Sequence, residues 1–366
     1  MTEPDPIDDN MTNIVQCITS DGEIIKDVVI DLSESELIKA YQVMTLTRTL
    51  DTKMVALQRQ GRIGFYLPSY GEEACSVGSA LGASSNDWFF PAYREQGAML
   101  QKGVSLNFII SHLRGSAEDE HKGRSLPGLF GSSAKRFVSP SAPVGTQIIH
   151  AVGTAFASKL LDDKVATIAY FGDGATSSND FHSGLNFAGV YKTPTVFFCK
   201  NNQWAISTHI SDQTASDGIA IKSKAYGFDG VVVDGNDILA VYTATKSAME
   251  KARSGKGPTL IEARTYRLSS HSTSDDGSRY QDQTEYKEWV SKDPIARFRR
   301  YLENSGIWNR DFEQEIQQKA ERQINEAITH AELSPMPSMD TLITDVYSEV
   351  PRSLRDDFND LKNSKN

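Results

Sequence analysis

The sequence predicts an α/β fold, with a mainly parallel sheet covered by helices on both faces. Two short apolar runs, at 165–171 and 195–199, are joined by a segment of helical character. A second alternation follows, in which apolar runs at 231–233 and 259–267 flank another helical segment. Repeated strand–helix–strand order is typical of parallel sheets, because a crossover helix must return the chain to the start of the next strand.

The other elements follow from capping residues and hydrophobic periodicity. Ser33 and Glu36 form a capping box, which predicts the start of a long amphipathic helix that ends at Gly61. Residues 115–145 are rich in Gly, Ser and Pro and predict a long ordered loop, a feature that usually carries function. Further helices are expected at 72–81, 95–102, 150–161, 238–253 and over much of the chain from 293, with a break at 335–351.

The composition bounds the kind of protein. The chain has 366 residues and a net charge of −10, without a dense Lys/Arg block, so neither nucleic acid nor a membrane surface is an expected partner. It has no apolar stretch of transmembrane length. The three cysteines show neither metal-ligand spacing nor a disulfide framework, and the acidic N-terminus resembles no signal or transit peptide. We therefore expect a cytoplasmic protein with an arm at 1–30, one α/β domain at 31–333 and a tail at 334–366.

Polar residues stand directly after the two apolar runs of the first strand–helix–strand unit. Gly172-Asp173-Gly174 follows the first run, and Asn201-Asn202 follows the second. Both groups should emerge at carboxyl ends of parallel strands, where open α/β sheets bind ligands. Asp and Asn oxygens suit a hard cation such as Mg²⁺, which also binds substrate phosphates. A dinucleotide-binding loop is the competing interpretation, but its third glycine position is Ser177.

This arrangement resembles the thiamine diphosphate motif, in which GDG is followed by Asn-Asn at a spacing similar to the one in this sequence. The resemblance implies that Asp173, Asn202 and the backbone carbonyl of Trp204 hold Mg²⁺. Further stretches resemble one family, the α subunit of the decarboxylating component of 2-oxo acid dehydrogenase complexes, and within it the branched-chain type. These stretches are FYLPSYGEEA, PAYREQG, PVGTQ, YRLSSHSTSDDGSRY and TDVYSEVP.

The family resemblance also assigns roles to individual residues. The resemblance implies that Arg94 contacts the cofactor diphosphate, and the planar guanidinium group of an arginine pairs well with phosphate oxygens. His271 is the expected catalytic residue, and Ser272 matches a site phosphorylated in mitochondrial relatives. The residues expected to bind the cofactor are Tyr93, Arg94, Ala142, Val144, Gly172, Gly174, Ala175, Lys200 and His271. An apolar pocket for the substrate is expected from Phe65, Leu67, Tyr93 and Val144.

One loop resembles a potassium site that steadies the cofactor in some relatives. It would comprise Ala142, Pro143, Thr146 and Gln147, and Ala142 stands where the family usually has Ser. Another departure is Ser270, where a second histidine often precedes the catalytic one. Neither removes a carboxylate or carboxamide from the expected magnesium site.

The resemblance implies an activity that needs other chains. The expected reaction is oxidative decarboxylation of branched-chain 2-oxo acids, with acyl transfer to the lipoyl group of an acyltransferase component. The chain has room only for the half of the site that binds the diphosphate, so we expect an α₂β₂ heterotetramer in which the β subunit supplies the cofactor's glutamate partner. The C-terminal tail is expected to pack on a partner subunit. Pyruvate or acetoin as substrate, and a catalytically silent paralogue, remain the alternatives.

Overall fold

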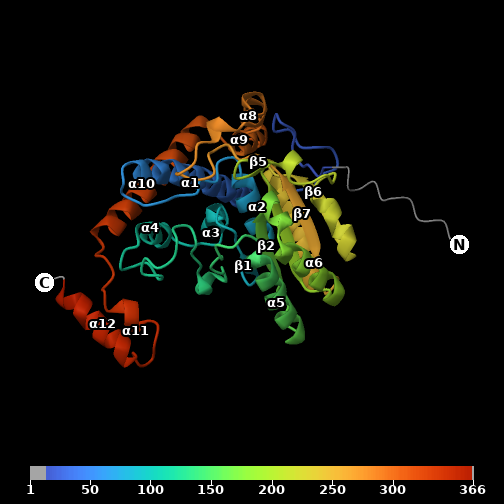
Figure 1. The fold of residues 1–366 in the computed structure, drawn as a ribbon. Coiled ribbons are helices and arrows are strands. Elements are labelled where there is room, and N and C mark those ends of the chain that lie inside the picture. Colours follow the sequence, from blue (N-terminus) through green and yellow to red (C-terminus); the bar gives the residue numbers. More distant parts are fainter. Residues whose placement is uncertain (1–13, 365–366) are drawn as a thin grey trace.

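The computed structural model describes residues 14–364, and the first 13 residues of the predicted arm lie outside the described part. The centre of the molecule is a five-stranded parallel sheet, as the sequence predicts (Figure 1). Its strands lie in the order β1 (Trp88–Phe90), β2 (Thr167–Gly172), β3 (Thr195–Asn201), β7 (Thr259–Arg264) and β6 (Asp229–Asp234). A separate antiparallel hairpin, β4 (Trp204–Ala205) and β5 (Thr208–His209), follows β3 directly.

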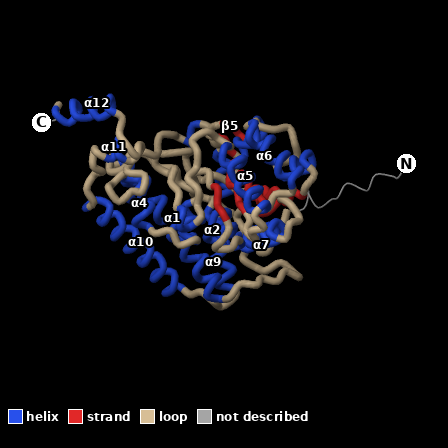
Figure 2. Tube along the Cα trace, turned by 90° about the horizontal axis from the view of Figure 1, so that it is seen from below, coloured by secondary structure: helices blue, strands red, loops and turns tan. Residues whose placement is uncertain are grey.

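Helices cover both faces of the sheet, so that the strands form a middle layer (Figure 2). One face carries α1 (Glu34–Arg59), α2 (Glu73–Gly82) and α7 (Ile238–Arg253). The other face carries α5 (Thr146–Leu160) and α6 (Asn179–Tyr191). The crossover helices α6 and α7 therefore lie on opposite faces, which allows both crossovers to be right-handed although they run in opposite directions across the sheet.

Successive side chains of a strand point to opposite faces of the sheet and pack into two separate hydrophobic cores. Ile168 and Tyr170 of β2 belong to the core beneath α1, α2 and α7. Ala169 and Phe171 belong to the core beneath α5 and α6. Both faces of β2 are therefore buried, which explains why its sequence is an uninterrupted apolar run rather than an alternating one.

The packing of α2 on α7 depends on glycine. A Cβ placed at Gly78 would lie 2.8 Å from the Ile238 carbonyl oxygen, and one at Gly82 would lie 2.8 Å from the Tyr242 carbonyl oxygen. The backbones of the two helices can approach this closely only because these positions carry no side chain. This packing fixes α2 against α7, and Glu72 directly precedes α2.

The remaining elements surround this core or extend from it. Between β1 and α5 lie α3 (Gln96–Gln101), α4 (Leu106–Arg114) and the short turn η2 (Ser133–Lys135). Another short turn, η4 (Ile210–Asp212), follows β5. Three further turns border the sheet: η3 (Asp173–Ser177), η5 (Ala220–Tyr226) and η6 (Gly277–Arg279). The C-terminal part holds α8 (Gln283–Val290), α9 (Pro294–Asn304), α10 (Arg310–Leu333), α11 (Thr341–Thr344) and α12 (Arg352–Asn363).

The last two helices stand away from the body of the molecule (Figure 1). They are tied to the long loop before η2, because Asp345 pairs with Lys122 at 2.5 Å and with Arg124 at 2.8 Å. The exposed apolar side chains of these helices and of the segment between them include Leu342, Val346 and Leu361. The break after α10 and the final helix match the sequence prediction, whereas packing of this tail on another subunit stays a prediction.

Candidate active site

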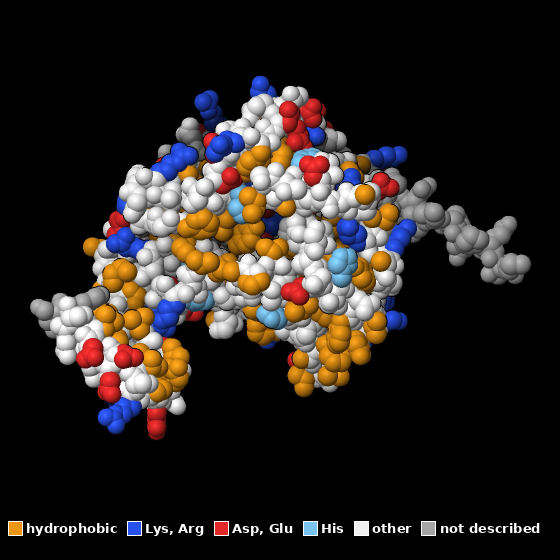
Figure 3. Space-filling view, in the orientation of Figure 1, with side chains coloured by type: hydrophobic (Ala, Val, Ile, Leu, Met, Phe, Trp, Pro, Cys, Tyr) orange, Lys and Arg blue, Asp and Glu red, His pale blue; other side chains and the backbone are white. Residues whose placement is uncertain are grey.

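A cavity of about 430 Å³ opens at the carboxyl ends of β2 and β3. Figure 3 shows a hollow on this face of the molecule, bordered by hydrophobic side chains. Asp173 follows β2 directly and Asn202 follows β3, and the parallel register pairs Gly172 with Lys200. The sheet therefore brings together two motifs that are separate in the sequence. All of the expected cofactor-binding residues and metal ligands line the cavity: Tyr93, Arg94, Ala142, Val144, Gly172, Asp173, Gly174, Ala175, Lys200, Asn202, Trp204 and His271.

Asp173 is buried and has one carboxylate oxygen without a partner. Nε2 of Gln213 donates to its Oδ2 at 2.5 Å, while Oδ1 makes no hydrogen bond within the described chain. Burial raises the pKa of Asp173 to about 6, although the Gln213 hydrogen bond opposes the rise. A cation at Oδ1 would favour the ionised carboxylate and remove the cost of the unpaired atom. The oxygen thus fits a metal ligand.

The other expected metal ligands lie at the start of the β4–β5 hairpin. The Asn202 side chain is buried, and its Oδ1 accepts from the Trp204 backbone N–H at 3.2 Å. The Trp204 carbonyl accepts from Nη1 of Arg267 at 3.2 Å. Residues 14–364 contain no cluster of three or more His, Cys, Asp or Glu suited to a metal. A cation here would therefore use one carboxylate with an amide and a carbonyl oxygen, a set that suits Mg²⁺ better than zinc.

The hairpin packs tightly against the turn that follows β2. A Cβ placed at Gly174 would lie 2.7 Å from Cβ of Ala205, so this position has room only for glycine. At the tip of the hairpin, Ile206 has a φ of 54°, a left-handed conformation that is unfavourable for a β-branched residue. Nη2 of the fully buried Arg267 donates to the Ile206 carbonyl at 2.6 Å and holds it there. Arg267 therefore shapes the cavity wall from behind.

Arg94 connects three segments of the cavity wall. Its Nε donates to the Pro68 carbonyl at 3.0 Å, and its Nη2 donates to the carbonyl of His271. The guanidinium carbon lies 4.8 Å from the centre of the Tyr93 ring. These contacts hold a buried positive charge in place at the cavity, as binding of a diphosphate would require.

His271 lies beside Arg94 in the cavity wall. Nη2 of Arg94 is 3.2 Å from its Nδ1. Since a guanidinium can only donate, Nδ1 must accept, and the neutral ring then carries its proton on Nε2. Burial, followed by the positive charges of Arg94 and Arg267, lowers the pKa of His271 to about 4. The ring is therefore neutral at physiological pH and can offer a hydrogen bond to a carbonyl or carboxylate.

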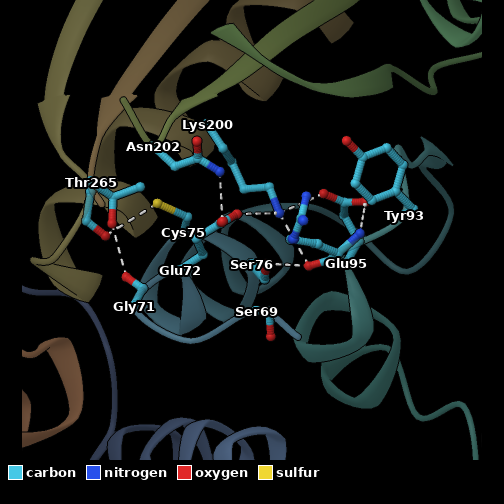
Figure 4. A network of polar contacts seen from close by, with 12 residues as sticks. Ser69, Gly71, Glu72, Cys75, Ser76, Tyr93, Glu95, Lys200, Asn202 and Thr265 are labelled. Carbon is cyan, nitrogen blue, oxygen red and sulfur yellow. Dashed lines mark hydrogen bonds and ion pairs between the residues drawn. The ribbon is translucent and has the colours of Figure 1, made fainter. Parts of the chain in front are cut away.

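A buried charged cluster forms the inner wall of the cavity (Figure 4). The Lys200 ammonium lies 3.0 Å from Oε2 of Glu72 and 2.7 Å from Oε1 of Glu95. Burial would raise the pKa of Glu72, but Lys200 and Arg94 outweigh it and hold the pKa below its ordinary value. Lys200 lines the cavity as expected, yet two carboxylates already engage its charge. Its contribution to a bound diphosphate stays a prediction.

Four predicted residues lie outside the cavity lining. Phe65 and Leu67, expected in the substrate pocket, do not line it, and Leu67 packs near Gly128 instead. Pro143 and Thr146 of the expected potassium loop do not line it either, whereas Ala142 and Gln147 do. Nε2 of Gln147 donates to the Tyr170 carbonyl at 2.9 Å, which ties the loop to β2. The potassium site itself stays a prediction.

Sequence reasoning missed four residues that organise the site: Glu72, Glu95, Gln213 and Arg267. Glu72 lies within the quoted stretch FYLPSYGEEA, Glu95 within PAYREQG and Arg267 within YRLSSHSTSDDGSRY, so the family resemblance could have drawn attention to these three. Their partners are distant in the chain; Asn202, for example, is 130 residues from Glu72. No local pattern announces such contacts.

The fold and the cavity together fit an α/β enzyme that binds a phosphorylated cofactor through a metal at the carboxyl edge of a parallel sheet. Comparison with known proteins gives the family. The profile of the family described as "Dehydrogenase E1 component" matches residues 41–340. The chain therefore belongs to the dehydrogenase E1 component family.

Individual relatives agree with this assignment. The chain is 42% identical over 325 residues to the human protein "2-oxoisovalerate dehydrogenase subunit alpha, mitochondrial", covering 88% of this chain and 73% of the relative. It is 43% identical to "3-methyl-2-oxobutanoate dehydrogenase subunit alpha" of Mycobacterium tuberculosis, covering 89% and 86%. Identity to "2-oxoisovalerate dehydrogenase subunit alpha 1, mitochondrial" of Arabidopsis thaliana is 41%, covering 93% and 72%.

Family membership establishes the coarse biochemical class. The chain is an α-type subunit of a 2-oxo acid dehydrogenase enzyme, and this family implies thiamine diphosphate as cofactor and a β subunit as partner. Among residues 14–364, no helix combines the length and apolar character needed to cross a bilayer.

Proposed function

We propose that this chain is the α subunit of a branched-chain 2-oxo acid dehydrogenase. It would act on acids such as 3-methyl-2-oxobutanoate, with Mg²⁺-bound thiamine diphosphate, and pass the acyl group to a lipoyl-bearing acyltransferase. The observation that carries the proposal is the buried, unpartnered Oδ1 of Asp173 beside Asn202 in a cavity at the sheet edge. The names of the relatives support the substrate class.

Each part of the cavity has a role in this proposal. Asp173, Asn202 and the Trp204 carbonyl would hold the cation, while Arg94 and the backbone N–H groups of Gly174 and Ala175 would bind the diphosphate. When bound, thiamine diphosphate supplies the electron sink that loss of CO₂ from a 2-oxo acid requires. The neutral His271 would donate a hydrogen bond from Nε2 to the substrate or its products.

The carboxylates of the cavity support the need for a partner subunit. Among the described residues, those lining the cavity are Glu72, Glu95 and Asp173. The first two pair with Lys200, and Asp173 is the proposed metal ligand. None is left to assist the cofactor's aminopyrimidine. A glutamate from the β subunit would complete the site in an α₂β₂ assembly.

Two of the four residues predicted for the substrate pocket line the cavity. Tyr93 and Val144 line the cavity and would contact the aliphatic chain of the acid. An apolar wall distinguishes one methylene group by only about 1–3 kcal/mol, so these two residues would separate the branched acids from one another only weakly.

The test is a dye-reduction assay on this chain co-expressed with its β subunit in the presence of thiamine diphosphate and Mg²⁺. Dye reduction reports oxidation of the 2-oxo acids and of acetoin alike, and CO₂ release is followed for the acids alone. We expect 3-methyl-2-oxobutanoate to be used in preference to pyruvate and acetoin, and Asp173→Ala to abolish turnover. A preference for pyruvate or acetoin would overturn the substrate class. A wild-type complex that binds no thiamine diphosphate would instead favour the silent paralogue.

A further inference from the structure

The amide of Asn202 is held between two groups that determine which of its ends faces the cavity. Its Nδ2 donates to Oε1 of Glu72 at 2.7 Å (Figure 4). Its Oδ1 accepts from the Trp204 backbone N–H at 3.2 Å. A carboxylamide with a donor end and an acceptor end can bind a cation only through the oxygen, so the direction of the amide decides whether a metal site exists.

Glu72 can select this direction because its carboxylate is itself held as an acceptor. Oε2 of Glu72 faces the Lys200 ammonium, which has only donors, at 3.0 Å. Oε1 therefore faces the amide, and the reverse orientation of Asn202 would bring two acceptor oxygens together in a buried site. Glu72 is fully buried at the start of α2, so water cannot relieve that clash.

The neighbouring Asn201 has the same pair of hydrogen bonds, but with a different glutamate. Nδ2 of Asn201 donates to Oε1 of the buried Glu262 at 2.8 Å, and its Oδ1 accepts from the Gln203 backbone N–H at 3.3 Å. Two successive asparagines thus each have their amide nitrogen bound to a buried glutamate. Only the Asn202 amide lies at the cavity.

We infer that Glu72 is a positioning residue for the metal site: it fixes the Asn202 amide so that Oδ1 is presented to the cation that holds the cofactor. The inference rests on the proposed function, since it assumes Asn202 is a ligand. Groups that orient metal ligands typically contribute about 10–100-fold to metal affinity. Glu72 would act in this way without touching the metal.

The test is the Mg²⁺ affinity of the complete α–β complex at saturating thiamine diphosphate, measured by calorimetry. Glu72→Gln keeps the size of the side chain but lets either amide end face Asn202. We expect its Mg²⁺ affinity to fall about 10–100-fold. The matched control is Glu95→Gln, which makes the same charge change beside Lys200 without contacting Asn202. An equal loss in both variants would overturn the inference.

A reciprocal exchange separates orientation from general damage to the cluster. Asn202→Asp alone places a second carboxylate against Glu72 and should weaken Mg²⁺ binding. In the double variant Glu72→Gln with Asn202→Asp, the amide introduced at position 72 can donate to the carboxylate introduced at position 202. Mg²⁺ affinity should then exceed that of both single variants. No recovery in a folded, assembled double variant would contradict the orienting role.

Failure of the proposed function gives a different result. If the wild-type complex shows no Mg²⁺-dependent binding of thiamine diphosphate, the metal site itself is wrong and the inference falls with it. If Glu72→Gln does not assemble, Glu72→Asp replaces it, because the shorter acid keeps its charge near Lys200 but withdraws from Asn202. Unchanged Mg²⁺ affinity in Glu72→Asp would then overturn the inference.

Discussion

Arg94 and His271 lie 177 residues apart in the chain, yet Nη2 of Arg94 is 3.2 Å from Nδ1 of His271. The same guanidinium donates to the His271 carbonyl and to that of Pro68. One side chain therefore ties together the segments after β1, after α1 and after β7. It provides positive charge at the cavity and also sets the tautomer of the histidine.

Replacement of Arg94 by lysine should impair cofactor binding although the charge is kept. A single ammonium cannot span the Pro68 and His271 carbonyls and still face a diphosphate. We expect Arg94→Lys to weaken thiamine diphosphate binding by about 10–100-fold, in line with the loss of one or two charged hydrogen bonds. Calorimetric titration of the α–β complex measures this. The control is Arg136→Lys. Nη1 of Arg136 donates to the Asn86 carbonyl outside the cavity, so this variant should bind thiamine diphosphate normally.

His271 should make the chain less stable in mild acid. Its folded pKa, lowered to about 4 by burial and by Arg94 and Arg267, lies below the ordinary value of 6.5. Between these pH values the unfolded chain binds a proton that the folded chain does not, so the free energy of unfolding falls as pH falls through the window. Urea unfolding at several pH values should show a shallower acid loss in His271→Gln than in wild type. Identical pH slopes would mean that the pKa of His271 is not lowered in the folded chain.

Asp51 is a buried carboxylate that anchors the segment before α2. It accepts from the Tyr66 hydroxyl at 2.6 Å and from the Ser69 backbone N–H at 2.7 Å. Burial raises its pKa to about 7, so its contribution to stability declines as pH rises from about 4 to about 7. Asp51→Asn has no such decline, so its stability relative to wild type should rise across that window, by at most about 4 kcal/mol, although its amide nitrogen cannot accept from the Ser69 N–H as the carboxylate does.

Removal of the side chain should have the opposite effect. Asp51→Ala leaves the Tyr66 hydroxyl and the Ser69 N–H without acceptors in a buried site, which should cost about 2–4 kcal/mol. Chemical unfolding at about pH 5 and pH 8 distinguishes the two variants. An asparagine variant whose stability relative to wild type does not rise between the two pH values would show that burial does not disfavour the ionised carboxylate.

The second glycine of the GDG motif, Gly174, should tolerate no side chain. Gly174→Ala would press a methyl group against Ala205 and displace the hairpin from the turn after β2, at a cost of about 1–3 kcal/mol. Gly153→Ala is the matched control: Gly153 is an exposed position of α5 where a Cβ meets no atom within 4 Å. It should gain about 0.5–1 kcal/mol of unfolding free energy, because alanine is the better helix former. Equal unfolding free energies for the two variants would refute the close approach at Gly174.

The elements with local signals were predictable from the sequence. The capping box of Ser33 and Glu36 starts α1 as expected, and α7 has the predicted bounds because Asp237 caps it. Helix α4 was not predicted, although its signals were present: Ser105 caps its start and Gly115 ends it in a left-handed conformation. The two-residue strands β4 and β5 are too short to carry a periodic pattern.

The candidate site shows where sequence reasoning stops. Asp173 and Asn202 could be placed together because parallel strands bring their carboxyl ends to one edge. The engagement of Lys200 by Glu72 and Glu95 could not be foreseen, since it depends on how α2 and α3 dock against β3. Local motifs thus predict the ligands, whereas the groups proposed to orient them come from tertiary packing.

The most direct measurement is a crystal structure of the α–β complex with thiamine diphosphate and Mg²⁺. We expect Mg²⁺ to be bound by Oδ1 of Asp173, Oδ1 of Asn202 and the Trp204 carbonyl, each at about 2.0–2.1 Å. The Asn202 amide nitrogen should remain on Glu72. A cofactor held elsewhere, or a metal without Asp173 among its ligands, would contradict the account.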